Sequence, residues 1–214
     1  MKEKIISITL FIVLAYVLPL MGRLSLLPTI QVGILIIFVI VLFSTQPPLK
    51  INEIRGDKQS DKNSVILILL GYFIGQLASV IEWAYFTNYA AWIWDWQTIT
   101  GLALMIGGTL FRVWCIRTLG RFFTATVKTQ EKQRIVTEGA YKVVRHPSYS
   151  GGYLAAVGSA VFLHAQIGVI ITMLALFIAY YFRIKAEEET LVGEFGDEYS
   201  VYKTKTKKLI PYIY

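Results

Sequence analysis

The chain has 214 residues, of which 55% are hydrophobic and 16% charged, and its mean hydropathy is +0.55. Such a composition excludes an ordinary soluble domain and predicts an integral membrane protein. The net charge of +7 does not indicate a nucleic-acid-binding surface, because the basic residues fall between apolar runs instead of forming one stripe. With one cysteine and two distant histidines, we expect neither an internal disulfide nor a metal site.

Six apolar segments are each expected to cross a hydrocarbon core of roughly 30 Å, which takes about 20 helical residues. They run from Ile5 to Met21, Ile30 to Thr45, Val65 to Phe86, Ile99 to Ile116, Tyr149 to Leu163 and Ile167 to Phe182. The last two are separated only by residues 164–166, which predicts a tight helical hairpin, and Pro147 suits the first turn of its first helix. The predicted fold is all-α and polytopic, with a cytoplasmic C-terminal helix.

The positive charges predict the orientation, because Lys and Arg in short loops are retained on the cytoplasmic side. With six spans and both termini inside, nineteen of the 21 basic residues are cytoplasmic, leaving Arg23 outside and Arg112 within a helix. A belt of aromatic residues is expected at the outer interface. It comprises Trp83, Tyr85, Tyr89, Trp92, Trp94 and Trp96. The expected location is the cell membrane if the chain is prokaryotic.

We expect residues 1–98 to form three N-terminal spans and residues 99–214 to form the functional core. Within the core, Arg112 lies about four residues before the predicted cytoplasmic end of its helix. Two interpretations of Arg112 are equally compatible with this position. Its side chain extends to the membrane surface as an anchor, or it serves a function inside the protein. The following segment, RTLGRFFTATV at 117–127, is expected to fold back as the wall of a pocket.

The first polar cluster lies in the stretch GAYKVVRHPSYSGG, from Gly139 to Gly152. Arg145 and His146 directly precede Pro147, which holds the residue before it extended. Two hydrogen-bond donors are thereby placed at a helix N-terminus, where an anionic group such as a carboxylate is favoured. Taken alone, this pattern more often marks basic residues that anchor a helix at the cytoplasmic surface.

The second polar cluster begins where the sixth apolar segment ends, in the sequence RIKAEEETL. Arg183 and Glu187 are four residues apart and share one helical face, and Glu188 follows them. Across a hairpin, this cluster faces the first one at the same membrane surface. Acidic groups there can hold an amino group, a ribose or a sulfonium, and arginines can hold carboxylates, so we predict an active site between the clusters.

At these residues the sequence resembles the isoprenylcysteine carboxyl methyltransferase family of integral membrane enzymes. The resemblance covers about the C-terminal half of the chain, and the N-terminal half matches only as apolar helices. Its motifs are LGRFFT at 119–124, Val-Thr-x-Gly-x-Tyr at 136–141, RHPSYSG at 145–151, RIKAEEETL at 183–191 and FGDEYSVY at 195–202. Each motif alone is weak, but five in this order at the family's spacing are specific.

The resemblance implies S-adenosylmethionine as methyl donor, bound at the cytoplasmic side. The residues that it assigns to the donor are Thr137, Gly139, Tyr141, His146, Pro147, Tyr149, Glu187 and Glu188. It also implies that an arginine, which we assign to Arg183, orients the acceptor carboxylate, and we take Arg145 as a second catalytic candidate. The implied acceptor is prenylcysteine-like or otherwise lipophilic and enters from the bilayer. The chain has no G-x-G-x-x-G motif, in keeping with a donor pocket built from helix ends.

Several alternatives stay open at this point. The same pattern occurs in phospholipid, amine and small-thiol methyltransferases and in nicotinamide-dependent reductases with a similar C-terminal hairpin. A non-enzymatic channel, transporter subunit or scaffold is a further class. The polar residues are confined to one surface, and none is predicted at the midplane of the apolar segments, which argues against a transport path.

Overall fold

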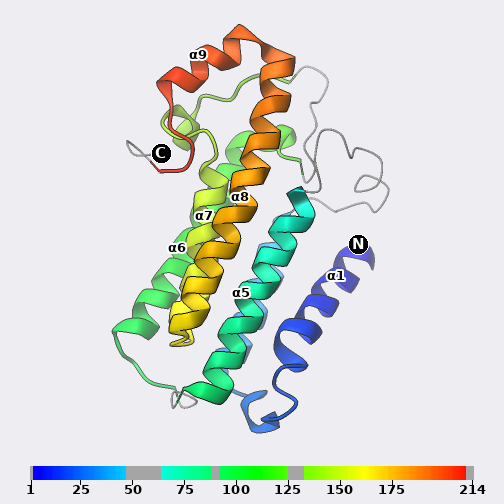
Figure 1. Ribbon diagram of the computed structural model, residues 1–214, viewed down its shortest axis with the longest axis vertical. Coiled ribbons are helices and arrows are strands. Elements are labelled where there is room, and N and C mark those ends of the chain that lie inside the picture. Colours follow the sequence, from blue (N-terminus) through cyan, green and yellow to red (C-terminus); the bar gives the residue numbers. More distant parts are fainter. Residues whose placement is uncertain (1, 47–63, 88–91, 125–132, 211–214) are drawn as a thin grey trace.

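The computed structural model of the chain describes residues 2–46, 64–87, 92–124 and 133–210, and these are helical apart from turns and one isolated bridge. The α-helices are α1 (Lys2–Ile12), α2 (Ile30–Ser44), α5 (Ser64–Phe86), α6 (Trp96–Leu119), α7 (Pro147–Phe162), α8 (Gln166–Phe195) and α9 (Asp197–Lys205). Figure 1 shows α5 to α8 running lengthwise together, with α1 beside α5 and α9 folded back from the end of α8. The all-α prediction is confirmed.

Three helices are long and apolar enough to cross a membrane by length and composition. These are α5, α8 and the stretch Trp96–Phe122, which contains α6. The apolar helices Lys4–Val17 and Ile30–Ser44 are shorter, and α7 has 16 residues. The prediction of six complete spans therefore remains a prediction.

The two ends of the bundle differ in their contacts. At one end, the Lys4 ammonium donates to the backbone carbonyls of Ser44 and Gln46, both at 2.7 Å, so α1 begins where α2 ends. At the opposite end, the Tyr85 hydroxyl donates to the Pro19 carbonyl at 2.9 Å. α1 and α2 therefore run antiparallel to each other, and α1 and α5 end at the same side of the bundle, as alternating crossings require.

The expected aromatic belt is only partly correct. Trp94 and Trp96 are 70% and 71% exposed, as interfacial side chains would be. Trp83, however, is only 1% exposed and packs in the core of the bundle with Val80 and Phe162. Its position on the inward face of α5 makes it a core residue. Tyr89 lies outside the described residues.

The turn between α7 and α8 is fixed by two acidic residues of neighbouring elements. His164, with a φ of +58°, turns the chain, and its Nε2 lies 2.8 Å from Oδ2 of Asp95. The Glu82 carboxylate accepts from the backbone N–H groups of Ile167 and Gly168, at 3.2 and 2.7 Å. An acidic group at a helix N-terminus satisfies donors that lack intrahelical partners. This end of the hairpin is therefore held firmly, and its other end carries the polar clusters.

Close contact between α6 and α7 depends on glycine. A Cβ added to Gly108 would lie 2.6 Å from the Ala155 nitrogen and 2.7 Å from the Gly151 oxygen, both backbone atoms that cannot move aside. We expect Gly108→Ala to lower the free energy of unfolding by about 1–3 kcal/mol, since overpacking forces the backbones apart. Thermal unfolding in detergent measures this effect.

The neighbouring glycine is a matched control for this experiment. A Cβ at Gly107 meets no atom within 4 Å. Gly107→Ala should therefore leave the unfolding temperature unchanged or raise it slightly, because alanine favours helix more than glycine does. Equal losses in the two variants would contradict the packing described for α6 and α7.

Candidate active site

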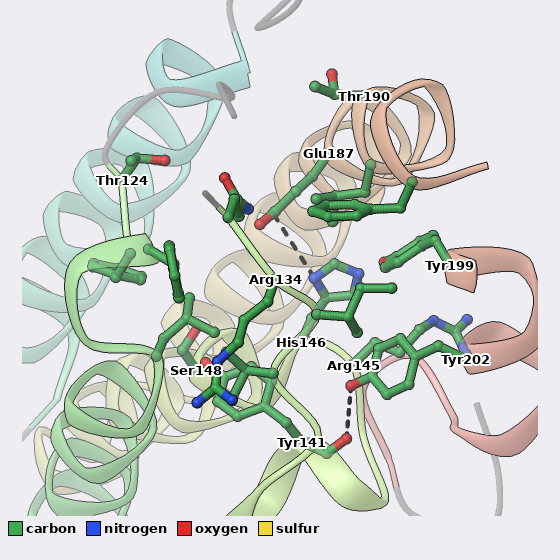
Figure 2. A pocket seen from close by; sticks show the side chains of 18 of the residues that line it. Thr124, Arg134, Tyr141, Arg145, His146, Ser148, Glu187, Thr190, Tyr199 and Tyr202 are labelled. Carbon is green, nitrogen blue, oxygen red and sulfur yellow. Dashed lines mark hydrogen bonds and ion pairs between the residues drawn. The ribbon is translucent and has the colours of Figure 1, made fainter. Parts of the chain in front are cut away.

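A pocket lies at the end of the bundle where α7 begins, and side chains distant in sequence point into it (Figure 2). The segment Leu119–Thr124 forms one wall, and α8 and α9 form another. The expectation that the segment after α6 forms the wall of a pocket is confirmed for Phe122 and Phe123. The polar residues that line it are Thr124, Gln133, Arg134, Tyr141, Arg145, His146, Ser148, Tyr149, Glu187, Thr190, Tyr199 and Tyr202.

The two predicted polar clusters meet through Glu188. Its Oε1 accepts from Nε of Arg145 at 2.8 Å and lies 3.3 Å from Nε2 of His146. All three side chains are at least nine-tenths buried. Glu188 does not line the pocket itself but holds two residues that do, so its contribution is to fix their positions.

Glu187, one residue earlier, turns toward the pocket. Its Oε2 lies 3.8 Å from Nδ1 of His146, an ion-pair distance drawn in Figure 2. The same oxygen accepts from the Tyr149 hydroxyl at 2.8 Å. The pocket therefore contains a partly exposed carboxylate beside an imidazole, a combination suited to a cationic or amine-bearing ligand.

Tyr149 separates the pocket from a deeper, buried layer. Its ring stacks on His146 on one side and on Tyr180 on the other, with centroids 5.8 and 4.9 Å apart. While it donates to Glu187, its hydroxyl accepts from Nε of Arg183 at 3.0 Å. Arg183 is buried and does not line the pocket, so one tyrosine connects the pocket's carboxylate to an arginine inside the bundle.

Arg112 belongs to the same buried layer. Because α6 continues to Leu119, the residue lies seven positions before the helix end, so the predicted distance of about four was wrong. Its Nη1 donates to the Ser148 carbonyl at 2.6 Å and its Nη2 to Oε1 of Gln46 at 3.0 Å. It does not extend to the surface, so the interpretation as a surface anchor was also wrong.

Two hydrogen-bond donors beside each other in this layer have no acceptor. Nε of Arg112 and Nε2 of Gln46 are both buried without a hydrogen-bond partner. Within the described ranges, no carboxylate forms an ion pair with Arg112. A buried cation with only neutral partners is costly, and this arrangement indicates a place for an anionic group.

The chain after α9 completes the first polar cluster. The backbone N–H of Arg145 donates to the carbonyl of Lys207 at 2.8 Å, and that of His146 donates to Lys208 at 3.0 Å. The Arg145 guanidinium also donates to the Thr206 carbonyl. The conformation just before α7 is thus set by a segment about sixty residues later in the sequence.

Removal of residues 206–214 is therefore expected to weaken ligand binding in the pocket by at least about tenfold. The deletion removes three backbone hydrogen bonds to residues 143–146 and the charged hydrogen bond from Arg145 to Thr206, of roughly 1 kcal/mol or more each. Calorimetry with the ligand proposed below measures the loss. A chain shortened only by residues 211–214 keeps these contacts and should bind normally; equal weakening in both would contradict a positioning role for residues 206–209.

Three buried tyrosines surround the Arg145 side of the pocket. Burial raises the pKa of Tyr141 and Tyr199 well above the usual range. Burial likewise raises the pKa of Tyr202 to about 12, although the nearby Arg145 charge lowers it. These hydroxyls are neutral donors at physiological pH, and that of Tyr202 donates to the Tyr141 carbonyl at 2.6 Å (Figure 2).

The structure separates the predicted site residues into two groups. Those that line the pocket are Tyr141, Arg145, His146, Tyr149 and Glu187. Those that lie outside its lining are Thr137, Gly139, Pro147, Arg183 and Glu188. Pro147 begins α7 as expected, and Gly139 adopts a φ of +58° close to the Trp114 ring, so both shape the backbone around the pocket.

Sequence reasoning did not assign several lining residues. Arg134 lies outside the five motifs, whereas Ser148 and Thr190 lie within RHPSYSG and RIKAEEETL but were given no role. Tyr199 and Tyr202 lie in the FGDEYSVY motif, three residues apart on α9, and this spacing could have indicated that both face the same site.

Fold and site together define an integral membrane protein with an enzyme-like pocket at one end of its helix bundle. Comparisons with known proteins identify the class more closely. A sequence model of the isoprenylcysteine carboxyl methyltransferase (ICMT) family matches residues 99–193. Protein-S-isoprenylcysteine O-methyltransferase B of Arabidopsis thaliana is 32% identical over 181 residues, covering 81% of this chain and 90% of that protein. The chain belongs to the isoprenylcysteine carboxyl methyltransferase family of enzymes.

Other relatives match over a smaller part of their length. The Homo sapiens protein-S-isoprenylcysteine O-methyltransferase is 34% identical over 123 residues, 55% of this chain and 42% of that protein. The probable enzyme of Oryza sativa subsp. indica is 34% identical over 53% of this chain and 60% of its own. A solved structure of a eukaryotic intramembrane Ras methyltransferase ICMT superimposes with a TM-score of 0.63 at 23% identity, covering 96% of this chain and 74% of that one. The last comparison supports the fold.

Proposed function

We propose that this protein transfers a methyl group from S-adenosylmethionine to the carboxylate of a prenylcysteine-like, lipophilic acceptor at the cytoplasmic face of the membrane. The observation that carries this proposal is the position of Tyr149. Its hydroxyl contacts Glu187 in the pocket at 2.8 Å and Arg183 in the buried layer at 3.0 Å. Binding groups for a cation and for an anion are thus separated by one side chain.

The pocket residues fit the proposed donor, which when bound supplies an electrophilic methyl group on a sulfonium. Glu187 and His146 would hold its charged portion, since a carboxylate favours a nearby cation. The rings of Phe122, Phe123 and Tyr199 would hold its base by aromatic contact. We assign Arg145 a positioning role, because Glu188 and the Thr206 carbonyl already occupy its guanidinium.

The buried layer suits the acceptor carboxylate. Arg183 orients it in our proposal, and the vacant donors of Arg112 and Gln46 supply further hydrogen bonds. Guanidinium groups bind carboxylates strongly because donors and acceptors are charged and their geometries match. Both arginines lie buried inside the bundle, and the proposal has the lipophilic acceptor enter there from the bilayer.

The chemistry requires little beyond this positioning. A carboxylate is ionised at neutral pH, so its attack on a methyl group needs no general base. Holding the two reactants in line can contribute roughly 7–11 kcal/mol of the acceleration. The cytoplasmic assignment rests on basic residues at this end of the bundle, since such residues are retained inside.

Calorimetry on the purified protein in detergent distinguishes the proposal from its alternatives. We expect S-adenosylmethionine to bind and reduced nicotinamide adenine dinucleotide phosphate not to bind. Binding of only the nicotinamide cofactor would indicate a reductase, and binding of neither would indicate a non-enzymatic membrane protein.

A further inference from the structure

A second groove lies on another face of α8, between this helix, α9 and the segment after α9. Of the residues assigned to methyl transfer, Glu188 alone lines this groove, and its side chain lies between the groove and the pocket. Figure 1 shows α9 folded back beside the end of α8, and residues of both helices line the groove. Its lining includes Phe177, Tyr181, Ile184, Lys185, Lys203 and Lys208.

The groove changes from apolar to basic along α8. Phe177 and Tyr181 are about half exposed and lie in the apolar part of the helix. Lys185 follows at helical spacing, on the same side, about 12 Å farther along the axis from Phe177. Lys203 of α9 and Lys208 face the same groove from the other wall. A groove that is apolar at one end and lined by lysines at the other suits a molecule with a hydrocarbon chain and an anionic headgroup.

The charge of the groove is positive despite its acidic residues. Glu188 is already neutralised by Arg145, whose Nε lies 2.8 Å from its Oε1. Among the described residues, no carboxylate lies within 4 Å of the Lys185 ammonium, which is exposed. Three lysines therefore face one further carboxylate, that of Glu189.

We propose that this groove binds one anionic phospholipid, with the phosphate between Lys185 and Lys203 and an acyl chain along Phe177 and Tyr181. Lysines just beyond the end of a membrane helix are attracted to anionic headgroups, and a basic pocket between helices selects them over zwitterionic ones.

The groove is coupled to the pocket through α9. Lys203 contacts Glu188 with 3.7 Å between Nζ and Oε2, and α9 also carries Tyr199 and Tyr202, which line the pocket. A phosphate that bridges Lys185 on α8 and Lys203 on α9 holds α9 in place. Bound anionic lipid should therefore increase the affinity of the pocket for the methyl donor severalfold. This increase rests on the proposed function, but the binding of lipid to the groove does not depend on it.

Native mass spectrometry of the detergent-purified protein tests the proposal, with phosphatidylglycerol and phosphatidylcholine of identical acyl chains as probes. We expect one phosphatidylglycerol to bind in preference to phosphatidylcholine. The triple variant Lys185→Gln, Lys203→Gln, Lys208→Gln should weaken phosphatidylglycerol binding by about 10- to 100-fold, given the contribution of each surface lysine. Its phosphatidylcholine binding should not change.

A second triple variant removes equal charge elsewhere at the same end of the molecule. Lys142, Lys205 and Lys207 have exposed side chains and do not line the groove, so their replacement by Gln should leave the preference intact. Equal losses in both variants, or no preference in the unaltered protein, would overturn the proposal. Circular dichroism checks that each variant is folded. The lipid preference of the unaltered protein is measured without the methyl donor, so a failure of the proposed function would not change that preference.

Discussion

Replacement of Glu188 by alanine is expected to abolish binding of the methyl donor, although Glu188 does not line the pocket. The substitution leaves Arg145 buried without its counter-ion and removes the nearer of the two carboxylates beside His146, and both of these residues line the pocket. Breaking a buried ion pair from one side costs about 3–5 kcal/mol, part of which appears as lost stability. Donor affinity by calorimetry and unfolding in detergent measure the two components.

The adjacent Glu189 provides the control for this substitution. It is exposed on α8 and lines the groove on the other face, away from the pocket. Glu189→Ala should bind the donor as the unaltered protein does. Normal donor affinity in Glu188→Ala would contradict the role assigned to Glu188 in holding Arg145 and His146.

Replacement of Arg183 by alanine is expected to reduce turnover by about 10²–10³-fold, while donor affinity changes much less. Arg183 does not line the pocket but contacts the Tyr149 hydroxyl, and in our proposal it orients the acceptor. Loss of one group that stabilises the reacting charge typically has an effect of this size. Arg183→Lys should not restore activity, because a lysine cannot reproduce the planar, two-pronged geometry.

Arg112→Ala should show the same separation between turnover and donor binding. Arg117, exposed on the same helix, is the matched control, and Arg117→Ala should retain both. Arg183→Ala could instead lose affinity for the donor while its turnover at saturating donor stayed unchanged. That result would contradict the role of Arg183 in orienting the acceptor.

The arrangement of α7 and α8 was predictable because the physical signals are local. Only three residues separate two apolar runs, which leaves no route except a tight reversal, and Pro147 fits the first position of a helix. By contrast, the end of α6 was misplaced because apolar composition falls before the helix stops, and this hid the burial of Arg112. Trp83 was misassigned because composition alone does not tell an interfacial tryptophan from one facing the core.

The sequence predicted that the two polar clusters meet, as they do at the pocket, but it did not show which of their residues face it. Glu187 and Glu188 are adjacent, and the helical turn of about 100° between them directs one into the pocket and the other behind it. Which one faces inward depends on how α8 is rotated against α7, a property of tertiary packing. The contacts of Lys207 and Lys208 with Arg145 and His146 are made by backbone atoms, so no side-chain pattern could indicate them.

The most direct test of the account is formation of a base-labile methyl ester from S-adenosylmethionine labelled in its methyl group. The purified protein in detergent is given an S-prenylcysteine derivative with a free carboxylate, or the matching carboxamide. Carboxyl methylation should give volatile, base-released label with the carboxylate and none with the carboxamide, and the product should be lost in Arg183→Ala. Transfer to the carboxamide, or base-stable label on another acceptor with none on the carboxylate, would contradict carboxyl methylation.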